Sequence, residues 1–408
     1  MVDLFGNSTQ DDNDLTHAMS DLISFDNDEF AGDEGFLSAQ NNMEDIVVYS
    51  RDWTVETVVN QIEKGNIDLN PEFQRRNAWN DVKKSSLVES YLMGYPVPEI
   101  VLAEHPRERK KYIVIDGKQR LLSLCGFLLH DKYKAWKTPK LKGLRDLTHL
   151  NTKSFHDLKQ EPRLNQYVRI LANSDVRCTV ISNVKNDDVL YDIFYRLNAG
   201  ATPLSMQELR QVLYSGPFAK FLIDYTSSIK NIHHTLRLDK PDNRLKDVET
   251  ILRLLAMINN LSSYNGNLKK HLDEFTLENN ELWDDNSERI KSQLQTIDES
   301  IELMAQTLGG FEYIGRKWNG EKTAMDTRFN TVLFEVQIYF AYFGKLAGIP
   351  PINQQKYLES FIKLCEDPTF NASISSSTKN SKEYEARYVK YQRMYKNLTG
   401  KVVSIPWN

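Results

Sequence analysis

A change of sequence period, from strand to helix across four polar residues, is the feature that most constrains the fold of this chain. Tyr112–Ile115 form a short continuous apolar run of β-favouring residues, which is typical of a buried strand. Directly after Asp116-Gly117-Lys118-Gln119, apolar residues recur at helical spacing from Leu121 to Leu128. The sequence therefore predicts a buried strand that passes into a helix through a sharp corner.

This corner has the composition of an anion site. The first turn of a helix has unpaired N–H donors and the positive end of the helix dipole, so it attracts phosphate. Gly117 permits close approach of the backbone, and Lys118 and Arg120 add mobile positive charge. The alternative is a tight turn whose polar residues merely face water, because short motifs often arise by chance.

The first half of the chain alternates helices with short strands. A helix is expected from Thr54 as N-cap to Gly65, followed by a short strand, and a second helix from Asn80 to Gly94. Strands are expected over 99–104, 111–116 and 176–184, with an irregular insertion and one short helix over about 131–160. A helix over 187–200 follows, and the capping box of Ser205 and Glu208 starts the next one.

Beyond this point the sequence has almost no strand signal. Helices are predicted near 217–228, 244–260, 286–307, 325–347, 351–365 and 381–396. The apolar stretch Phe329–Phe343 is interpreted as core, with a dimer interface as the alternative, so a homo-oligomer stays open. Length alone predicts two or three domains, at about 150 residues each. We therefore predict an α+β fold with a tail over 1–45, a mixed α/β domain over 46–215 and an all-helical domain over 216–408.

The charge is unevenly distributed along the chain. Residues 1–45 contain 12 Asp and Glu and neither Lys nor Arg, so the rest has 51 basic and 44 acidic side chains, a net of +7. The tail has too little apolar surface to offset the entropy of ordering and is expected to be disordered. Two alternatives are that the tail competes with nucleic acid for the basic body, or that it docks on a partner through Leu22, Ile23, Phe25 and Phe30.

Several classes of protein are excluded. No apolar run approaches the roughly 20 residues of a membrane span, and the N-terminus lacks the features of a signal peptide, so a cytoplasmic protein without membrane contact is expected. Cys125, Cys178 and Cys365 have neither disulfide nor metal-ligand spacing. His233 and His234 are the only clustered histidines, and adjacent residues point apart on a helix.

Polar and aromatic residues gather in three further stretches, which are NPEFQRRNAW, FYRLNAGATPLSMQELR and RLKDVETILR. Each alone is explained by salt bridges on solvated faces. Three motifs in order along the chain resemble the DGQQR-motif family. They are P-x-F-Q-R-x-x-x-W, V-I-D-G-x-Q-R-L and F-x-R-L-N-x-G-x-x-x-L-x-x-x-E-L. This family is the ParB/sulfiredoxin-like N-terminal domain of GmrSD-type restriction and phage-defence proteins, and the resemblance extends from about residue 50 to 215.

The resemblance implies a ParB-like fold with a nucleotide site. It assigns catalytic positions to Asp116, Gln119 and Arg120, with Asp116 as ligand of Mg²⁺. It assigns nucleotide or phosphate binding to Gly117, Lys118, Gln74, Arg75, Arg196 and Asn198. Lys118 departs from the family, which usually has Gln there. No histidine follows His271, so the separate His-metal nuclease domain of GmrSD-type enzymes is not expected in this chain. Any cleavage would then come from a separate nuclease or defence subunit, or from the ParB-like domain itself.

Three functions remain open. The first is a domain that binds and hydrolyses a nucleoside triphosphate in phage defence or DNA restriction; the absence of G-x-x-x-x-G-K-[ST] excludes a P-loop enzyme. The second is a metal-dependent DNA nuclease built on Asp116-Gly117-Lys118 and Glu99, which resembles a D-x-K arrangement. The third is a non-enzymatic DNA-binding or scaffold protein, although a net charge of +7 over 363 residues is weak for DNA binding alone.

Overall fold

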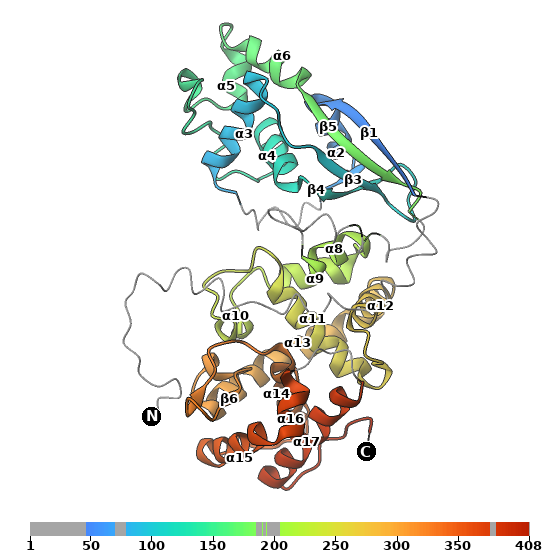
Figure 1. Cartoon of the computed structure of the whole chain (residues 1–408), viewed down its shortest axis with the longest axis vertical. Coiled ribbons are helices and arrows are strands. Elements are labelled where there is room, and N and C mark those ends of the chain that lie inside the picture. Colours follow the sequence, from blue (N-terminus) through green and yellow to red (C-terminus); the bar gives the residue numbers. More distant parts are fainter. Residues whose placement is uncertain are drawn as a thin grey trace. The chain divides into compact units, whose positions relative to one another are not determined.

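The computed structural model describes residues 46–69, 79–184, 205–375 and 381–407, together with Leu190 and Ile193. These residues form two compact units that divide between Leu213 and Tyr214, close to the expected boundary at 215/216 (Figure 1). The first unit is mixed α and β, and the second is helical apart from one very short hairpin. No described helix combines the length and apolarity needed to cross a membrane.

The first unit is built on a mixed five-stranded sheet with strand order β1-β5-β3-β4-β2. The pairs β1–β5 and β3–β4 are antiparallel, whereas β3–β5 and β2–β4 are parallel. The strands are β1 (Val47–Thr54), β2 (Ile67–Asp68), β3 (Ile100–Glu104), β4 (Tyr112–Asp116) and β5 (Asp175–Ser182). Of these, β1 was not predicted: most of its side chains are exposed, so it lacks the apolar alternation by which a strand is detected.

The helices of this unit begin and end largely where the sequence signals lie. Thr54 caps α2 (Val55–Glu63) by accepting from the N–H of Thr57 at 3.2 Å. Asn80 caps α3 (Asp81–Met93), which ends at Gly94 in the left-handed conformation. The remaining elements are α4 (Lys118–Leu128), η5 (Thr148–Leu150), α5 (Phe155–Gln160), α6 (Asn165–Asn173) and α8 (Met206–Leu213). Helix α6 was not predicted; it follows the expected insertion.

The sheet and the helices enclose one hydrophobic core. Helix α2 contacts β1, β2 and β5, and it also packs on α4 and α6 (Figure 1). Tyr112–Ile115 are buried, which confirms the predicted buried strand. The sheet is strongly curled, because the ring centroid of Trp53 on edge strand β1 lies 6.0 Å from that of Tyr112 on β4, although β5 and β3 lie between these strands in the sheet order.

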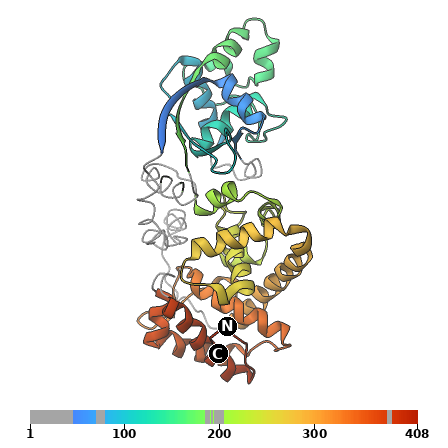
Figure 2. The same ribbon diagram turned by 90° about the vertical axis from the view of Figure 1, so that its right-hand side faces the viewer.

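The second unit is a bundle of helices (Figure 2). Nearly all of α14 is buried, which identifies the apolar stretch Phe329–Phe343 as core. Its helices are α9 (Pro217–Tyr225), α10 (Asn231–Thr235), α11 (Lys246–Asn260), α12 (Leu268–Glu281), α13 (Trp283–Leu308), α14 (Thr331–Leu346), α15 (Gln354–Glu366), α16 (Pro368–Ser375) and α17 (Ser381–Thr399). Helices α10, α12 and α16 were not among the predicted segments. A hairpin of β6 (Trp318–Asn319) and β7 (Ala324–Met325) corrects the expectation of an all-helical domain.

The three cysteines and His233 are buried in the protein interior. Cys125, Cys178 and Cys365 are free and buried. His233 Nε2 lies 2.9 Å from Asp247 Oδ2, and both side chains are fully buried. Within the described ranges no three His, Cys, Asp or Glu side chains come together as metal ligands. His233 is therefore a core histidine with a carboxylate partner.

Candidate functional site

The predicted corner is formed at the carboxyl end of β4. The strand ends at Asp116, Gly117 follows with φ 92°, and α4 begins at Lys118. This φ lies in the left-handed region, which L side chains rarely adopt. A Cβ at this position would also overlap Cδ1 of Ile100. The backbone conformation therefore favours glycine here, and any side chain would also have to displace the terminal methyl group of Ile100.

The amino end of α4 is left without a side-chain cap. Gly117 occupies the N-cap position and has no side chain that could accept from the first turn. Its carbonyl accepts the ordinary helical bond from Leu121 N at 3.0 Å. The first N–H groups of a helix have no partner within the helix and point along its axis. The corner thus presents N–H donors and the positive helix end, as the sequence predicted.

Arg120 fixes the two sides of the corner to each other. Its Nη2 donates to Asp116 Oδ2 at 2.8 Å and to the backbone oxygen of Glu99 at 2.9 Å. The Arg120 side chain is 14% exposed, so these bonds hold the guanidinium in place. Its Nε is buried, and so is Oε1 of Gln119; neither atom has a hydrogen-bond partner in the described part of the chain. Buried polar atoms of this kind normally have partners, so both atoms are available to a ligand or a water molecule.

Asp116 is the accessible acid of the site. Its side chain is 53% exposed, and the ion pair with Arg120 uses Oδ2. Within the described ranges Oδ1 stays open to a ligand. Mg²⁺ is usually held by one or two carboxylates together with phosphate oxygens and waters. A single exposed carboxylate next to an uncapped helix end fits this requirement.

Lys118 differs from the mobile cation that the sequence predicted. Only 8% of the residue is exposed, and burial lowers the pKa of its ammonium group, an effect opposed by Glu208 and Asp68. Glu208 is held by the predicted capping box, in which Ser205 N donates to Glu208 Oε2 at 2.6 Å and Glu208 N donates to Ser205 Oγ at 3.1 Å. The ammonium group of Lys118 is therefore directed to the protein interior near acidic side chains.

A second acid and a hydroxyl lie next to the corner. Thr179 Oγ1 on β5 donates to Glu99 Oε2 at 2.8 Å. Glu99 directly precedes β3, whereas the sequence suggested that it was part of that strand. Thr179 was missed by sequence reasoning, because the register that places it next to Val101 follows only from the pairing of β3 with β5.

The predicted residues divide into two groups. The structure brings together Asp116, Gly117, Lys118, Gln119 and Arg120 in one corner. The other four predicted residues lie outside the described residues, and they are Gln74, Arg75, Arg196 and Asn198. Their assignment to the nucleotide site stays a prediction.

The fold and the corner define a mixed α+β domain with an uncapped helix at its strand-to-helix junction. Residues 55–215 match the family model described as GmrSD restriction endonuclease, N-terminal domain. The match includes the whole corner and supports a GmrSD-type N-terminal domain in this segment, which implies interaction with DNA and suggests a restriction or phage-defence protein. Comparison with curated proteins and with solved structures finds no match.

Proposed function

We propose that this protein binds a nucleoside triphosphate at the corner of β4 and α4, hydrolyses it with Mg²⁺, and acts in DNA restriction or phage defence in the cytoplasm. In this proposal the first unit is a ParB/sulfiredoxin-like domain and Asp116-Gly117-Lys118-Gln119-Arg120 is its DGQQR motif. The observation that carries the proposal is the uncapped end of α4 next to two buried polar atoms, Gln119 Oε1 and Arg120 Nε, that have no hydrogen-bond partner among the described residues.

Each residue of the corner has a distinct role in this proposal. The first N–H groups of α4 bind a phosphate oxygen, for which Gly117 provides access. Arg120, already fixed by Asp116, neutralises phosphate charge without a large loss of side-chain entropy. Gln119 orients the attacking water. When bound at Asp116, Mg²⁺ would neutralise the charge that develops on the phosphate oxygens.

Gln74, Arg75, Arg196 and Asn198 complete the nucleotide site in this proposal, as the family resemblance implies. Lys118 contributes positive potential from its buried position rather than a direct mobile contact. A separate nuclease or defence subunit would carry out any cleavage that depends on histidine and metal.

The D-x-K nuclease is the weaker alternative. It needs a lysine that projects from a strand beside metal-bound water. Lys118 is instead the first residue of a helix and is buried. The nucleotide site is therefore favoured, and the scaffold role is retained as the outcome if no nucleotide binds.

The test is phosphate release from a panel of ribonucleoside and deoxyribonucleoside triphosphates with Mg²⁺. The intact protein is compared with Asp116→Asn and Arg120→Ala, and with Asp131→Asn and Arg163→Ala as exposed controls in the same unit. Removal of one such electrostatic group is expected to slow turnover by about 10²–10³-fold. Unchanged turnover in both corner variants, or no saturable nucleotide binding by the intact protein, would overturn the proposal.

A further inference from the structure

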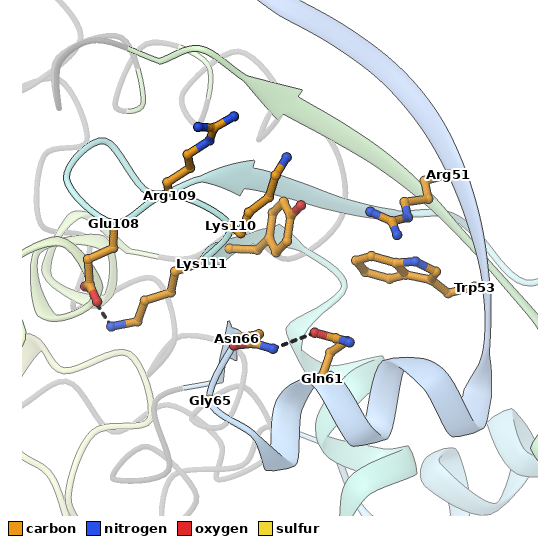
Figure 3. A pocket seen from close by; sticks show the side chains of 10 residues that line it. Arg51, Trp53, Gln61, Gly65, Asn66, Glu108, Arg109, Lys110 and Lys111 are labelled. Atoms are coloured by element: carbon orange, nitrogen blue, oxygen red, sulfur yellow. Dashed lines mark hydrogen bonds and ion pairs between the residues drawn. The ribbon is translucent and has the colours of Figure 1, made fainter.

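A polar pocket lies at the opposite end of β4 from the corner (Figure 3). It has a volume of about 430 Å³ and is formed by β1, the end of α2 and the turn that leads into Tyr112. Tyr112 and Asp116 are the first and last residues of β4, so their Cα atoms are about 13 Å apart at the usual rise per residue. The pocket is therefore separate from the nucleotide site proposed above.

One wall of the pocket offers a flat cationic surface. Cζ of Arg51 lies 4.6 Å from the ring centroid of Trp53, and Figure 3 shows the guanidinium over this ring. The ring itself is buried and braced by its edge contact with Tyr112. The residue Arg51 is exposed, so the outer face of its guanidinium is open to a ligand. A guanidinium plane held in this way is a surface on which unpaired bases stack.

The rim of the pocket is basic. Arg109, Lys110 and Lys111 come from the turn between β3 and β4 and, with Arg51, give four cationic side chains against the single carboxylate of Glu108. Nζ of Lys111 lies 2.7 Å from Oε1 of Glu108, which is a close ion pair. Nζ of Lys110 lies 3.9 Å from Oε1 of Glu104, which is a weaker contact. Arg109 is exposed and has no ion-pair partner within the described ranges. The rim therefore has excess positive charge for a phosphate.

The turn that holds these cations is fixed by its own hydrogen bonds. His105 N donates to Lys111 O at 2.8 Å, and Lys110 N donates to Glu104 Oε1 at 2.9 Å. Lys110 has a φ of 65°, which directs the chain sharply at this point. A turn already ordered in the free protein loses less entropy when it binds a ligand.

The wall opposite Arg51 provides amide groups. Asn66 Nδ2 donates to Gln61 Oε1 at 2.8 Å, as Figure 3 shows. This bond leaves Gln61 Nε2 as a donor and Asn66 Oδ1 as an acceptor, with no other partner in the described part of the chain. A donor and an acceptor side by side add polar groups to the pocket, on the other side of the Trp53 ring from Arg51.

We infer that this pocket binds one unpaired nucleotide of a DNA single strand. The base stacks on the outer face of the Arg51 guanidinium, while Arg109 and Lys110 hold the adjoining phosphates. The choice of DNA as the ligand rests on the proposed role in DNA restriction. The location of the binding site rests on the pocket alone. A blunt duplex has no unpaired base to offer, so it fits this pocket poorly.

The experiment measures binding of a short fluorescent single-stranded oligonucleotide to the full chain over a salt series, without nucleoside triphosphate or Mg²⁺. Arg51→Lys keeps the charge but removes the planar face, so affinity should fall by about tenfold with an unchanged salt slope. Arg109→Gln should lower the magnitude of the salt slope by about one. Arg177→Lys and Arg169→Gln, two exposed residues outside the pocket, are the matched controls.

Three unlabelled competitors identify the form of nucleic acid that binds. The single strand should be displaced by an unlabelled single strand and much less by a blunt duplex or by free deoxynucleoside monophosphate. Equal competition by the duplex, or displacement by the mononucleotide at similar concentration, would overturn the inference. So would equal affinity of Arg51→Lys and Arg177→Lys when both have the thermal unfolding midpoint of the intact protein. The binding assay contains neither triphosphate nor Mg²⁺. A failure of single-strand binding at the pocket is therefore observed separately from a failure of triphosphate binding at the corner.

Discussion

Gly117 determines the shape of the corner at the scale of single residues. Its φ of 92° and its contact with Ile100 leave no room for a side chain, and the uncapped end of α4 depends on that absence. Arg120 then ties Asp116 to the backbone before β3. These three residues were identified from the sequence because strand, glycine and helix follow one another within ten positions.

Gly117→Ala is expected to lower the free energy of unfolding by about 2–4 kcal/mol, since a left-handed alanine and an overpacked contact are both introduced. Gly94→Ala is the matched control. Gly94 has φ 71° and open space at the position that a Cβ would occupy, so about 1 kcal/mol is expected there. Urea unfolding of both variants measures the difference, and equal losses would contradict the close approach to Ile100.

Lys118→Gln tests the buried ammonium group through pH. Burial lowers the pKa of Lys118 in the folded protein below its ordinary value of 10.5. Between these two pKa values the unfolded chain binds a proton that the folded chain lacks, so the free energy of unfolding rises with pH. The intact protein should therefore gain stability relative to Lys118→Gln as pH increases toward 10.5.

Thermal or urea unfolding over a pH series checks this sign. The comparison between the two proteins removes the titration of groups that they share. A stability difference independent of pH would show that Lys118 is solvated, and a difference of opposite slope would show that its charged form is stabilised by the fold.

At the scale of elements, a buried ion pair joins two helices of the second unit. Nε of Arg253 on α11 donates to Oε1 of Glu335 on α14, and both side chains are 1% exposed. Sequence periodicity predicted both helices correctly. It gave no indication that Arg253 and Glu335 are buried together. Their pairing depends on the packing of α11 against α14.

Glu335→Gln is expected to lower the free energy of unfolding by about 3–5 kcal/mol, because the guanidinium of Arg253 stays buried without its carboxylate. The double variant Arg253→Met/Glu335→Leu removes both charges and should lose less than the single variant. Chemical denaturation compares the two. A double variant less stable than Glu335→Gln would indicate that the pair itself, rather than an isolated charge, governs stability.

At the scale of the whole molecule, charge separates the first 45 residues from the rest. The full chain has a net charge of −5, whereas residues 46–408 have +7. Both the corner and the basic pocket belong to the positive part. Long-range electrostatics therefore favour nucleic acid more strongly when the acidic residues are absent.

A chain that begins at residue 46 is expected to bind single-stranded DNA several-fold more tightly than the full chain at low salt. The difference should decrease as salt is added, because screening weakens both the attraction to DNA and the competition by acids. Fluorescence anisotropy with one oligonucleotide measures both proteins. Equal affinity at low salt would contradict a competing role for residues 1–45.

The sequence by itself determined the features that depend on neighbouring residues. These are the buried β4, the corner at Gly117, the cap at Thr54, the start of a helix at Asn80, and the change from a mixed unit to a helical one. Each follows from local periodicity, backbone freedom or capping within a few positions. The same locality explains why the exposed edge strand β1, with no apolar alternation, was missed.

The tertiary structure alone decided which distant residues meet. It placed Lys118 near Glu208 and Asp68, paired Glu99 with Thr179, and curled the sheet so that Arg51 and Trp53 share a pocket with the turn before Tyr112. These contacts depend on strand order and register, which no short window of sequence contains. The corner could be predicted because it is continuous in the chain, and the pocket could not because its parts are more than 40 residues apart.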